Sequence, residues 1–199
     1  MSPKTIEFFF DFGSPTTYLA HTQLPRIARE VGATLHYRPM LLGGVFKATG
    51  NASPVTVPAK GRWMGQDVAR FAARYQVPFR FNPSFPINTL TLMRGAVGMQ
   101  AQQPEQFARY LDAVFDAMWA HPRNLGDAAE LAEVLQQAGF DPDAFSILVA
   151  DPAVKAALVA QTEAAVARGV FGAPTCFVGE QMFFGQDRLD FVREAALAR

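Results

Sequence analysis

The segment KTIEFFFDFGSPTTYL, residues 4–19, predicts a buried strand that runs directly into a helix. Its first part, up to Phe10, is rich in β-formers and almost wholly apolar, as expected of a strand covered on both faces. Ser14 is a good helix N-cap and Pro15 suits the first helical turn, so the helix should begin there. Apolar residues then recur at near-helical spacing until Gly32, which should end the helix.

The chain beyond this helix first continues as a β-α-β unit and then becomes helical. Residues 33–39 predict a second strand, parallel to the first because a helix connects them. Residues 43–58 are rich in Gly, Pro, Ser and Asn and predict a loop. A long helical stretch follows, and further helix starts are indicated at Gly126-Asp127, Asp141-Pro142 and Asp151-Pro152.

The β signal returns after Gly169. Residues 175–178 and 182–184 predict a hairpin, and a final helix follows. The order β-α-β, helices, α-β-β-α is the pattern of an α/β thioredoxin-like fold with a large all-helical insertion. We therefore predict a discontinuous thioredoxin-like domain, residues 1–42 and 151–199, and an inserted helical domain, residues 43–150.

Composition narrows the classes of function. Half of the 199 residues are hydrophobic, enough for a sizeable core. The 18 basic and 18 acidic residues cancel, so charge gives no reason to expect a nucleic-acid or membrane partner. A single cysteine excludes an internal disulfide and a cysteine-based zinc site, and the three histidines lack metal-ligand spacing. These two observations predict a protein without a metal. No signal-like or membrane-spanning segment is apparent, which predicts a cytoplasmic protein.

Ser14 is the first candidate for chemistry. In a thioredoxin-like fold the turn after the first strand holds a redox dithiol at a helix N-terminus, where the helix field favours a thiolate. Here Ser14 takes the first cysteine position and Thr17 the second, so dithiol exchange is excluded at this site. Either Ser14 is only an N-cap, or its hydroxyl also donates a hydrogen bond to the thiolate of a bound thiol cofactor. The two roles are compatible, because one uses the oxygen as acceptor and the other as donor.

Ala173 and Pro174 form the second candidate, just before a predicted strand. A trans proline starting the strand is the ordinary interpretation. A cis Ala173-Pro174 bond would instead turn the backbone of Ala173 outward and leave its N–H and C=O free to pair with an extended peptide. Cys176, in the strand itself, has no neighbour that would lower its pKa and is interpreted as a small buried hydrophobe.

Two further groups of polar residues are candidates for binding. Gln186, Asp187 and Arg188 open the last helix and either hold the charged end of a ligand or form an ordinary cap with a surface arginine. Lys60 and Arg62 sit beside Trp63, next to the loop that contains Asn51; they either recognise a carboxylate on an aromatic substrate or form a solvated helix start.

Together these motifs resemble the 2-hydroxychromene-2-carboxylate isomerases and the kappa-class glutathione transferases, within the DsbA-like group of thioredoxin folds. The resemblance spans nearly the whole chain and rests on the order and spacing of five segments: residues 10–15 with Tyr18-Leu19, 38–44, 50–51 with 58–62, 169–175 and 184–189. Trp63 and Phe184 stand where relatives often carry Tyr and Trp.

The resemblance implies glutathione as cofactor and a role for each candidate. Ser14 would contact the glutathione sulfur, and Ala173, beside cis Pro174, would pair its backbone with the cysteinyl unit. The remaining assignments are Gln186, Asp187 and Arg188 to the γ-glutamyl end, Asn51 and Lys60 to the glycyl carboxylate or the substrate, and Trp63 to the substrate. A homodimer is also implied.

Three functions follow as hypotheses. The leading one is glutathione-dependent interconversion of 2-hydroxychromene-2-carboxylate and trans-o-hydroxybenzylidenepyruvate, a step in aromatic-hydrocarbon catabolism, by transient thiolate addition to the enone. The second is a kappa-like transferase that conjugates glutathione to other electrophiles. The third is a thioredoxin-like binding or chaperone module without catalysis, for which Ser14→Ala would leave every activity unchanged.

Overall fold

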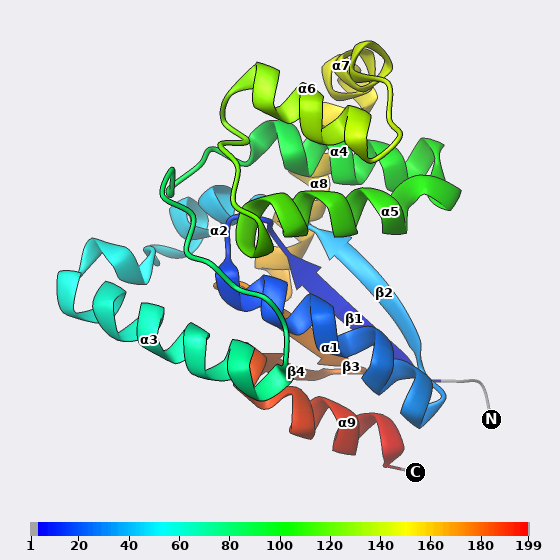
Figure 1. Ribbon diagram of the computed structural model, residues 1–199. Coiled ribbons are helices and arrows are strands. Elements are labelled where there is room, and N and C mark those ends of the chain that lie inside the picture. Colours follow the sequence, from blue (N-terminus) through cyan, green and yellow to red (C-terminus); the bar gives the residue numbers. More distant parts are fainter. Residues whose placement is uncertain (1–3, 199) are drawn as a thin grey trace.

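A mixed four-stranded sheet in the order β2-β1-β3-β4 forms the centre of the computed structural model, which describes residues 4–198 (Figure 1). β1 pairs in parallel with β2, and β3 pairs antiparallel with both β1 and β4. The strands are β1 (Thr5–Phe10), β2 (Thr34–Pro39), β3 (Thr175–Val178) and β4 (Gln181–Phe184). The parallel pair and the hairpin are therefore as predicted.

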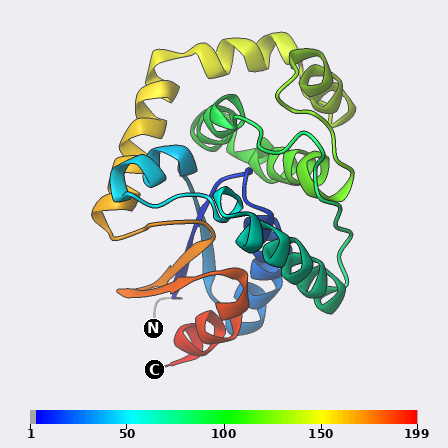
Figure 2. The same cartoon turned by 90° about the vertical axis from the view of Figure 1, so that its left-hand side faces the viewer.

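Nine α-helices surround the sheet in the described part of the chain (Figures 1 and 2). α1 and α9 pack against one face, with α3 beside α1, while α8 packs against the other face together with α2. Helices α4 to α7 gather beyond the carboxyl end of β1. The helices are α1 (Pro15–Val31), α2 (Leu42–Thr49), α3 (Pro58–Tyr75), α4 (Leu90–Gln102), α5 (Pro104–Phe115), α6 (Ala128–Gln137), α7 (Pro142–Ala150), α8 (Pro152–Ala167) and α9 (Leu189–Leu197).

β1 is buried on both faces because its side chains alternate between two cores. Phe8 and Phe10 join the larger core under α1, whereas Phe9 joins a smaller one with Phe177 and residues of α8. The near-continuous apolar sequence of β1 is what burial on both faces requires. Because both faces of β1 are packed, its carboxyl end is held rigidly, and so is the turn with Ser14 that follows it.

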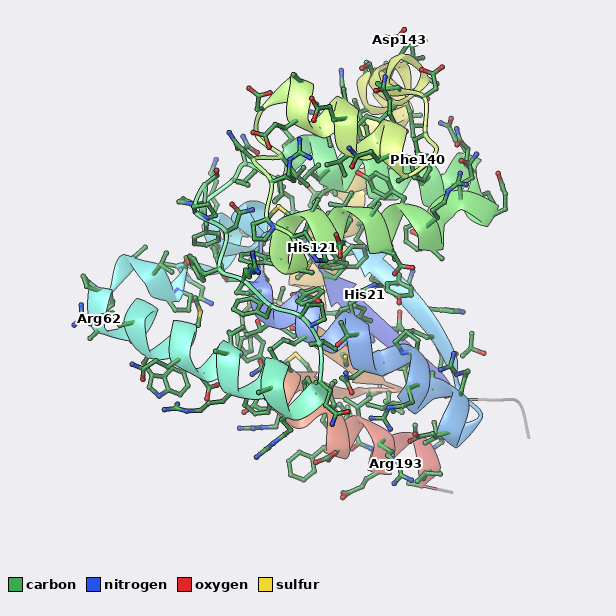
Figure 3. All side chains as sticks on the ribbon, viewed as in Figure 1. His21, Arg62, His121, Phe140, Asp143 and Arg193 are labelled. Carbon is green, nitrogen blue, oxygen red and sulfur yellow. The ribbon has the colours of Figure 1, made fainter. Side chains whose placement is uncertain are left out.

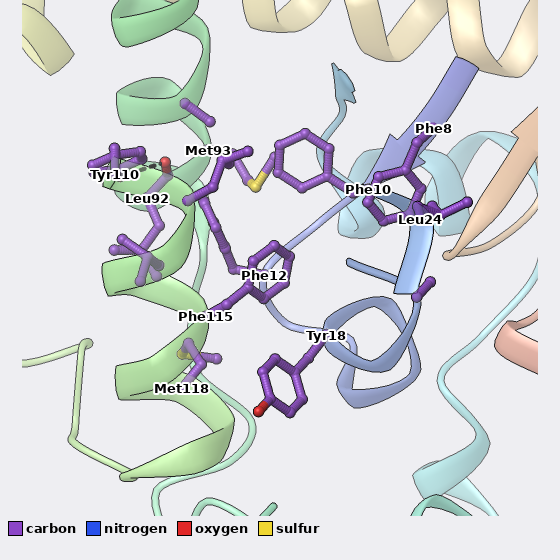
Figure 4. Packing of buried hydrophobic residues seen from close by; sticks show 14 of the residues in the cluster. Phe8, Phe10, Phe12, Tyr18, Leu24, Leu92, Met93, Tyr110, Phe115 and Met118 are labelled. Carbon is purple, nitrogen blue, oxygen red and sulfur yellow. Dashed lines mark hydrogen bonds between the residues drawn. The ribbon is translucent and has the colours of Figure 1, made fainter. Parts of the chain in front are cut away.

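Aromatic packing joins the helical part of the chain to the sheet (Figure 4). The ring of Phe12 lies 4.7 Å from that of Phe115 and 5.9 Å from that of Tyr110, both on α5. The indole of Trp119, in the π-helical turn Asp116–Ala120, donates a hydrogen bond of 2.7 Å to the Phe12 carbonyl. The turn after β1 is therefore fixed both by β1 and by contacts with α5 and the π-helical turn that follows it.

Most predicted helix ends are confirmed. The Ser14 side chain caps α1, Gly32 ends it in the left-handed conformation, and the side chains of Asp127, Asp141 and Asp151 cap α6, α7 and α8. The predicted loop over residues 43–58 is wrong in its first half, where α2 lies. The cap of α2 comes from a distant residue: the Asp11 carboxylate accepts the Leu42 N–H at 2.8 Å.

Two kinds of feature are absent from the described residues. No helix within 4–198 is both long enough and apolar enough to cross a membrane. Across the same residues, no three His, Cys, Asp or Glu side chains are grouped as metal ligands would be.

Candidate functional site

A cleft of about 870 Å³ opens where the N-terminus of α1 meets the turns before β3 and α9. Residues 50–57 and the first half of α3 form its opposite wall, and the figures show this segment next to the turn before β3 (Figure 2). Pro174 is buried and does not line the cleft. The predicted site residues that line it are Ser14, Asn51, Lys60, Trp63, Ala173, Gln186, Asp187 and Arg188.

Ser14 lies at the base of this cleft and is only 6% exposed. Its oxygen accepts the Thr17 N–H at 3.2 Å, which caps α1, and its hydroxyl donates to the Ala173 carbonyl at 3.1 Å. The first turn of α1 carries no acidic residue, so no side-chain charge there offsets the positive end of the helix. Ser14 is therefore both a cap and a hydrogen-bond donor, in a field that favours an anion.

Thr17, at the second cysteine position, does not face the cleft. It is fully buried, and its hydroxyl oxygen has no hydrogen-bond partner within residues 4–198. The chemistry of the helix start therefore rests on Ser14 and its neighbour Thr16, whose hydroxyl oxygen lies 2.9 Å from that of Ser14.

The Ala173-Pro174 peptide bond is cis, as the sequence predicted. Ala173 lines the cleft, and its N–H has no acceptor among the described residues. The expectation that its carbonyl is also free is wrong, because the hydroxyls of Ser14 and Thr16 reach that oxygen at 3.1 and 3.4 Å. The carbonyl of Pro174 accepts the Gly185 N–H at 3.0 Å and so joins this turn to the one before α9.

The polar turn before α9 is a 3₁₀ turn, Gln186–Arg188. Gln186 is buried, and its carbonyl accepts the Tyr75 hydroxyl at 2.8 Å. Asp187 and Arg188 are exposed and pair with each other. The Asp187 side chain caps neither this turn nor α9, so the interpretation of Asp187 as an ordinary helix cap is wrong. The turn offers both a carboxylate and a guanidinium to the cleft.

The opposite wall carries the candidates of residues 51–63. The Asn51 amide donates to the Phe171 carbonyl at 2.8 Å and so joins this wall to the turn before β3. Lys60 and Trp63 are exposed on the first turns of α3, and the described residues provide no carboxylate partner for Lys60. Arg62 points away from the cleft into solvent (Figure 3). A free ammonium beside an indole suits a carboxylate on an aromatic ligand.

Sequence reasoning missed Asp11, which organises two edges of the cleft. Its buried carboxylate accepts the N–H groups of Gly13 and Leu42, both at 2.8 Å. Burial raises the pKa of Asp11, while these bonds and one from Thr89 oppose the rise. The available signal was a polar residue at the end of a buried strand. That signal does not reveal the second partner of Asp11, Leu42, because Leu42 lies 31 positions away.

Most apolar residues of the cleft were also not predicted, apart from Trp63 and Phe184. The apolar part of the cleft is lined by side chains from separate segments that no sequence periodicity connects: Phe46, Met64, Phe85, Phe171 and Phe184. Cys176 is buried as expected, and burial raises the pKa of its thiol to about 12. Cys176 is therefore not a nucleophile near neutral pH.

A second groove, of about 640 Å³, lies between α1, β2 and α5. His21 is at its base, with ring nitrogens 3.0 Å from an Asp112 oxygen and 3.2 Å from the Tyr37 hydroxyl (Figure 3). None of the predicted site residues lines this groove.

Known proteins are similar to this chain in both fold and sequence. The model of the DsbA-like thioredoxin domain matches residues 5–196. A 2-hydroxychromene-2-carboxylate isomerase of Sphingobium xenophagum is 36% identical over 98% of each chain, and human glutathione S-transferase kappa 1 is 28% identical over 96% of this chain and 89% of its own. A solved 2-hydroxychromene-2-carboxylate isomerase structure superimposes with a TM-score of 0.85 at 32% identity, covering 96% of this chain and 93% of that one.

The matches extend over the whole sheet and the helices inserted into it, so they include every segment that borders the cleft. The isomerases are more similar in sequence than the kappa-class protein. The chain therefore belongs to the DsbA-like thioredoxin family, in the group formed by the 2-hydroxychromene-2-carboxylate isomerases and the kappa-class glutathione transferases.

Proposed function

We propose that this protein is a glutathione-dependent isomerase that interconverts 2-hydroxychromene-2-carboxylate and trans-o-hydroxybenzylidenepyruvate in aromatic-compound catabolism. The observation that carries the proposal is the buried Ser14 hydroxyl, which lines the cleft at the N-terminus of α1, a helix whose first turn has neither a cysteine nor an acidic residue. Such a site has no nucleophile of its own but is suited to holding one that is brought by a ligand.

The residues of the cleft offer complementary groups for the parts of glutathione. The Ala173 N–H has no partner among the described residues and suits a peptide carbonyl. Asp187 and Arg188 offer the opposite charges that the ammonium and carboxylate of a γ-glutamyl group require, and Lys60 offers an ammonium for the glycyl carboxylate or the substrate.

Bound glutathione would supply a thiolate that adds reversibly to the conjugated enone, so that the former double bond rotates before the thiolate leaves. The protein has three tasks in this scheme. Ser14 and the N-terminus of α1 favour the thiolate over the thiol. Lys60 and Trp63 orient the aromatic carboxylate, and Phe46, Phe85 and Phe184 exclude water around it.

The test is the absorbance change of the chromene on isomerisation, followed with and without glutathione. We expect turnover only with glutathione. Ser14→Ala should lower kcat/KM about tenfold to a hundredfold, which corresponds to the loss of one hydrogen bond to a charged group. A rate that is independent of glutathione would refute the proposal.

A control must separate the cap from the chemistry, since Ser14→Ala also removes an N-cap at a cost of about 1 kcal/mol. Asp141→Ala is matched, because it removes the cap of α7, far from the cleft. We expect Asp141→Ala to lose comparable stability and to keep full activity.

A kappa-like conjugating transferase is the second candidate, favoured by the similarity to human glutathione S-transferase kappa 1. Conjugation of glutathione to a chlorinated nitroaromatic, measured beside the isomerisation, separates the two functions by their relative kcat/KM. We expect isomerisation to be the more efficient reaction.

We also propose that the enzyme works in the cytoplasm as a homodimer. Glutathione keeps the cytosol reducing, which suits a site that depends on a free thiol. The dimer is supported by the family to which the chain belongs, and light scattering over a range of concentrations tests it.

A further inference from the structure

Two hydroxyl groups compete for one carbonyl at the base of the cleft. Ser14 Oγ lies 3.1 Å from the Ala173 oxygen, Thr16 Oγ1 lies 3.4 Å from the same oxygen, and the two hydroxyl oxygens are 2.9 Å apart. Both residues line the cleft. Each hydroxyl has a single proton to donate, so the number of acceptors decides where the two protons go.

The single proton of the Ser14 hydroxyl cannot be donated to both the Ala173 carbonyl and a bound thiolate. Its oxygen accepts the Thr17 N–H, and its proton is directed to the Ala173 carbonyl. A bound thiolate needs that same proton. If Ser14 turned its proton to the sulfur with no replacement, the hydrogen bond to the Ala173 carbonyl would be lost, and leaving that part-buried oxygen without a partner has a cost.

We propose that Thr16 is the positioning residue that frees the Ser14 proton for the sulfur of the bound thiol. When the thiolate is present, the Thr16 hydroxyl takes over the Ala173 carbonyl and the Ser14 hydroxyl turns to the sulfur. The two hydroxyls then supply two protons to two acceptors, while the Thr17 N–H still caps α1. This inference rests on the proposed use of glutathione and assigns Thr16 a role in that same site.

The pKa of the bound thiol measures this effect directly, without activity. The protein is saturated with glutathione, and the ultraviolet absorbance of the bound thiolate is then measured as a function of pH. Ser14→Ala should raise the thiol pKa by about one to two units, because it removes one hydrogen bond to a charge. Thr16→Val should raise it by about a third to a half of that shift, because Ser14 then divides its proton between the carbonyl and the sulfur.

Two further variants separate a hydroxyl effect from a change in packing. Thr16→Ser keeps the hydroxyl and should restore the wild-type pKa to within experimental error. Thr22→Val is the matched control: Thr22 is on the same helix, its hydroxyl donates to the Leu19 carbonyl, and it lies in the other groove. It should leave the thiol pKa unchanged. Thr16→Ala, checked by circular dichroism, replaces Thr16→Val if the latter does not fold.

The outcomes distinguish this inference from the proposed function. A shift for Ser14→Ala with none for Thr16→Val, or failure of Thr16→Ser to restore the pKa, overturns the role of Thr16 and leaves the role of Ser14 intact. A wild-type protein that binds no glutathione, or binds it with the pKa of the free thiol, overturns the proposed function and this inference with it.

Discussion

Gly185 joins the turn before β3 to the polar turn before α9. Its N–H donates to the Pro174 carbonyl, and its φ of 100° and ψ of 150° are open essentially to glycine alone. A methyl group there would lie 2.5 Å from the Asp187 carboxylate. We expect Gly185→Ala to lose about 1–3 kcal/mol of stability. By displacing Asp187, it should also weaken glutathione binding about tenfold, as measured by calorimetry.

Gly179→Ala separates backbone strain from the effect on binding. Gly179 also has a positive φ, 60°, but an added methyl group meets nothing within 4 Å. The strain should cost about 1–2 kcal/mol with no change in glutathione Kd. If Gly185→Ala binds glutathione as tightly as Gly179→Ala does, the turn before α9 does not hold the γ-glutamyl end.

Two of the residues that sequence reasoning found at this site, Ser14 and Ala173, share a local signature. Ser14 stands before a proline at a helix start, and Ala173 stands before a proline at a strand start. Thr16 and Asp11 have no such signature, because their partners lie 157 and 31 positions away. Contacts of that kind depend on how β1 and the turn before β3 come together, which the pattern of a single segment does not encode.

Glu7 joins three elements on the face of the sheet covered by α8. Its carboxylate pairs with Arg38 of β2 at 2.6 Å and with Arg168, just after α8, at 2.7 Å. Burial opposes ionisation, but the two guanidinium groups outweigh it and lower the pKa of Glu7 below its ordinary value. A lowered folded-state pKa gives stability that is present above the ordinary pKa and is lost as the pH falls through the lowered one.

We therefore expect Glu7→Gln to lose about 1 kcal/mol near neutral pH, a small value because the arginines are partly exposed. The loss should vanish once the pH is below the lowered pKa, and urea midpoints measured across this range test it. Glu163→Gln is the matched control, since Glu163 is exposed on α8 and forms no ion pair among the described residues. A loss that is the same at every pH would show that charge is not the cause.

The elements that the sequence predicted well carry their own end signals. The helices α1, α6, α7 and α8 each have an N-cap side chain next to the first turn, so local pattern is enough to place their starts. α2 was missed because Asp11 supplies its cap and because Gly43 and Gly44 lower its helix propensity. Gly44 has a structural reason: a methyl group there would lie 3.1 Å from the Thr162 side chain of α8.

The predicted thioredoxin-like domain and the predicted inserted domain share one hydrophobic core. One contiguous core includes Phe10 of the sheet, Leu24 of α1, and Tyr110 and Phe115 of α5. Exposing either part would therefore expose apolar surface of the other. The predicted boundaries follow from the order of elements along the sequence, whereas this shared packing depends on the tertiary structure.

We accordingly expect the two predicted domains to unfold in one cooperative transition. The chain provides a local probe for each: buried Trp119 reports on the insertion, and the single buried thiol, Cys176, reports on the sheet. Trp63→Phe leaves Trp119 as the only tryptophan, because the chain has two. Trp119 fluorescence and the extent of Cys176 labelling, both measured at equilibrium against urea, should then give the same midpoint. Two separate midpoints would mean that the insertion is stable without the sheet, and that the aromatic contacts of Phe12 with α5 contribute little to the stability of either part.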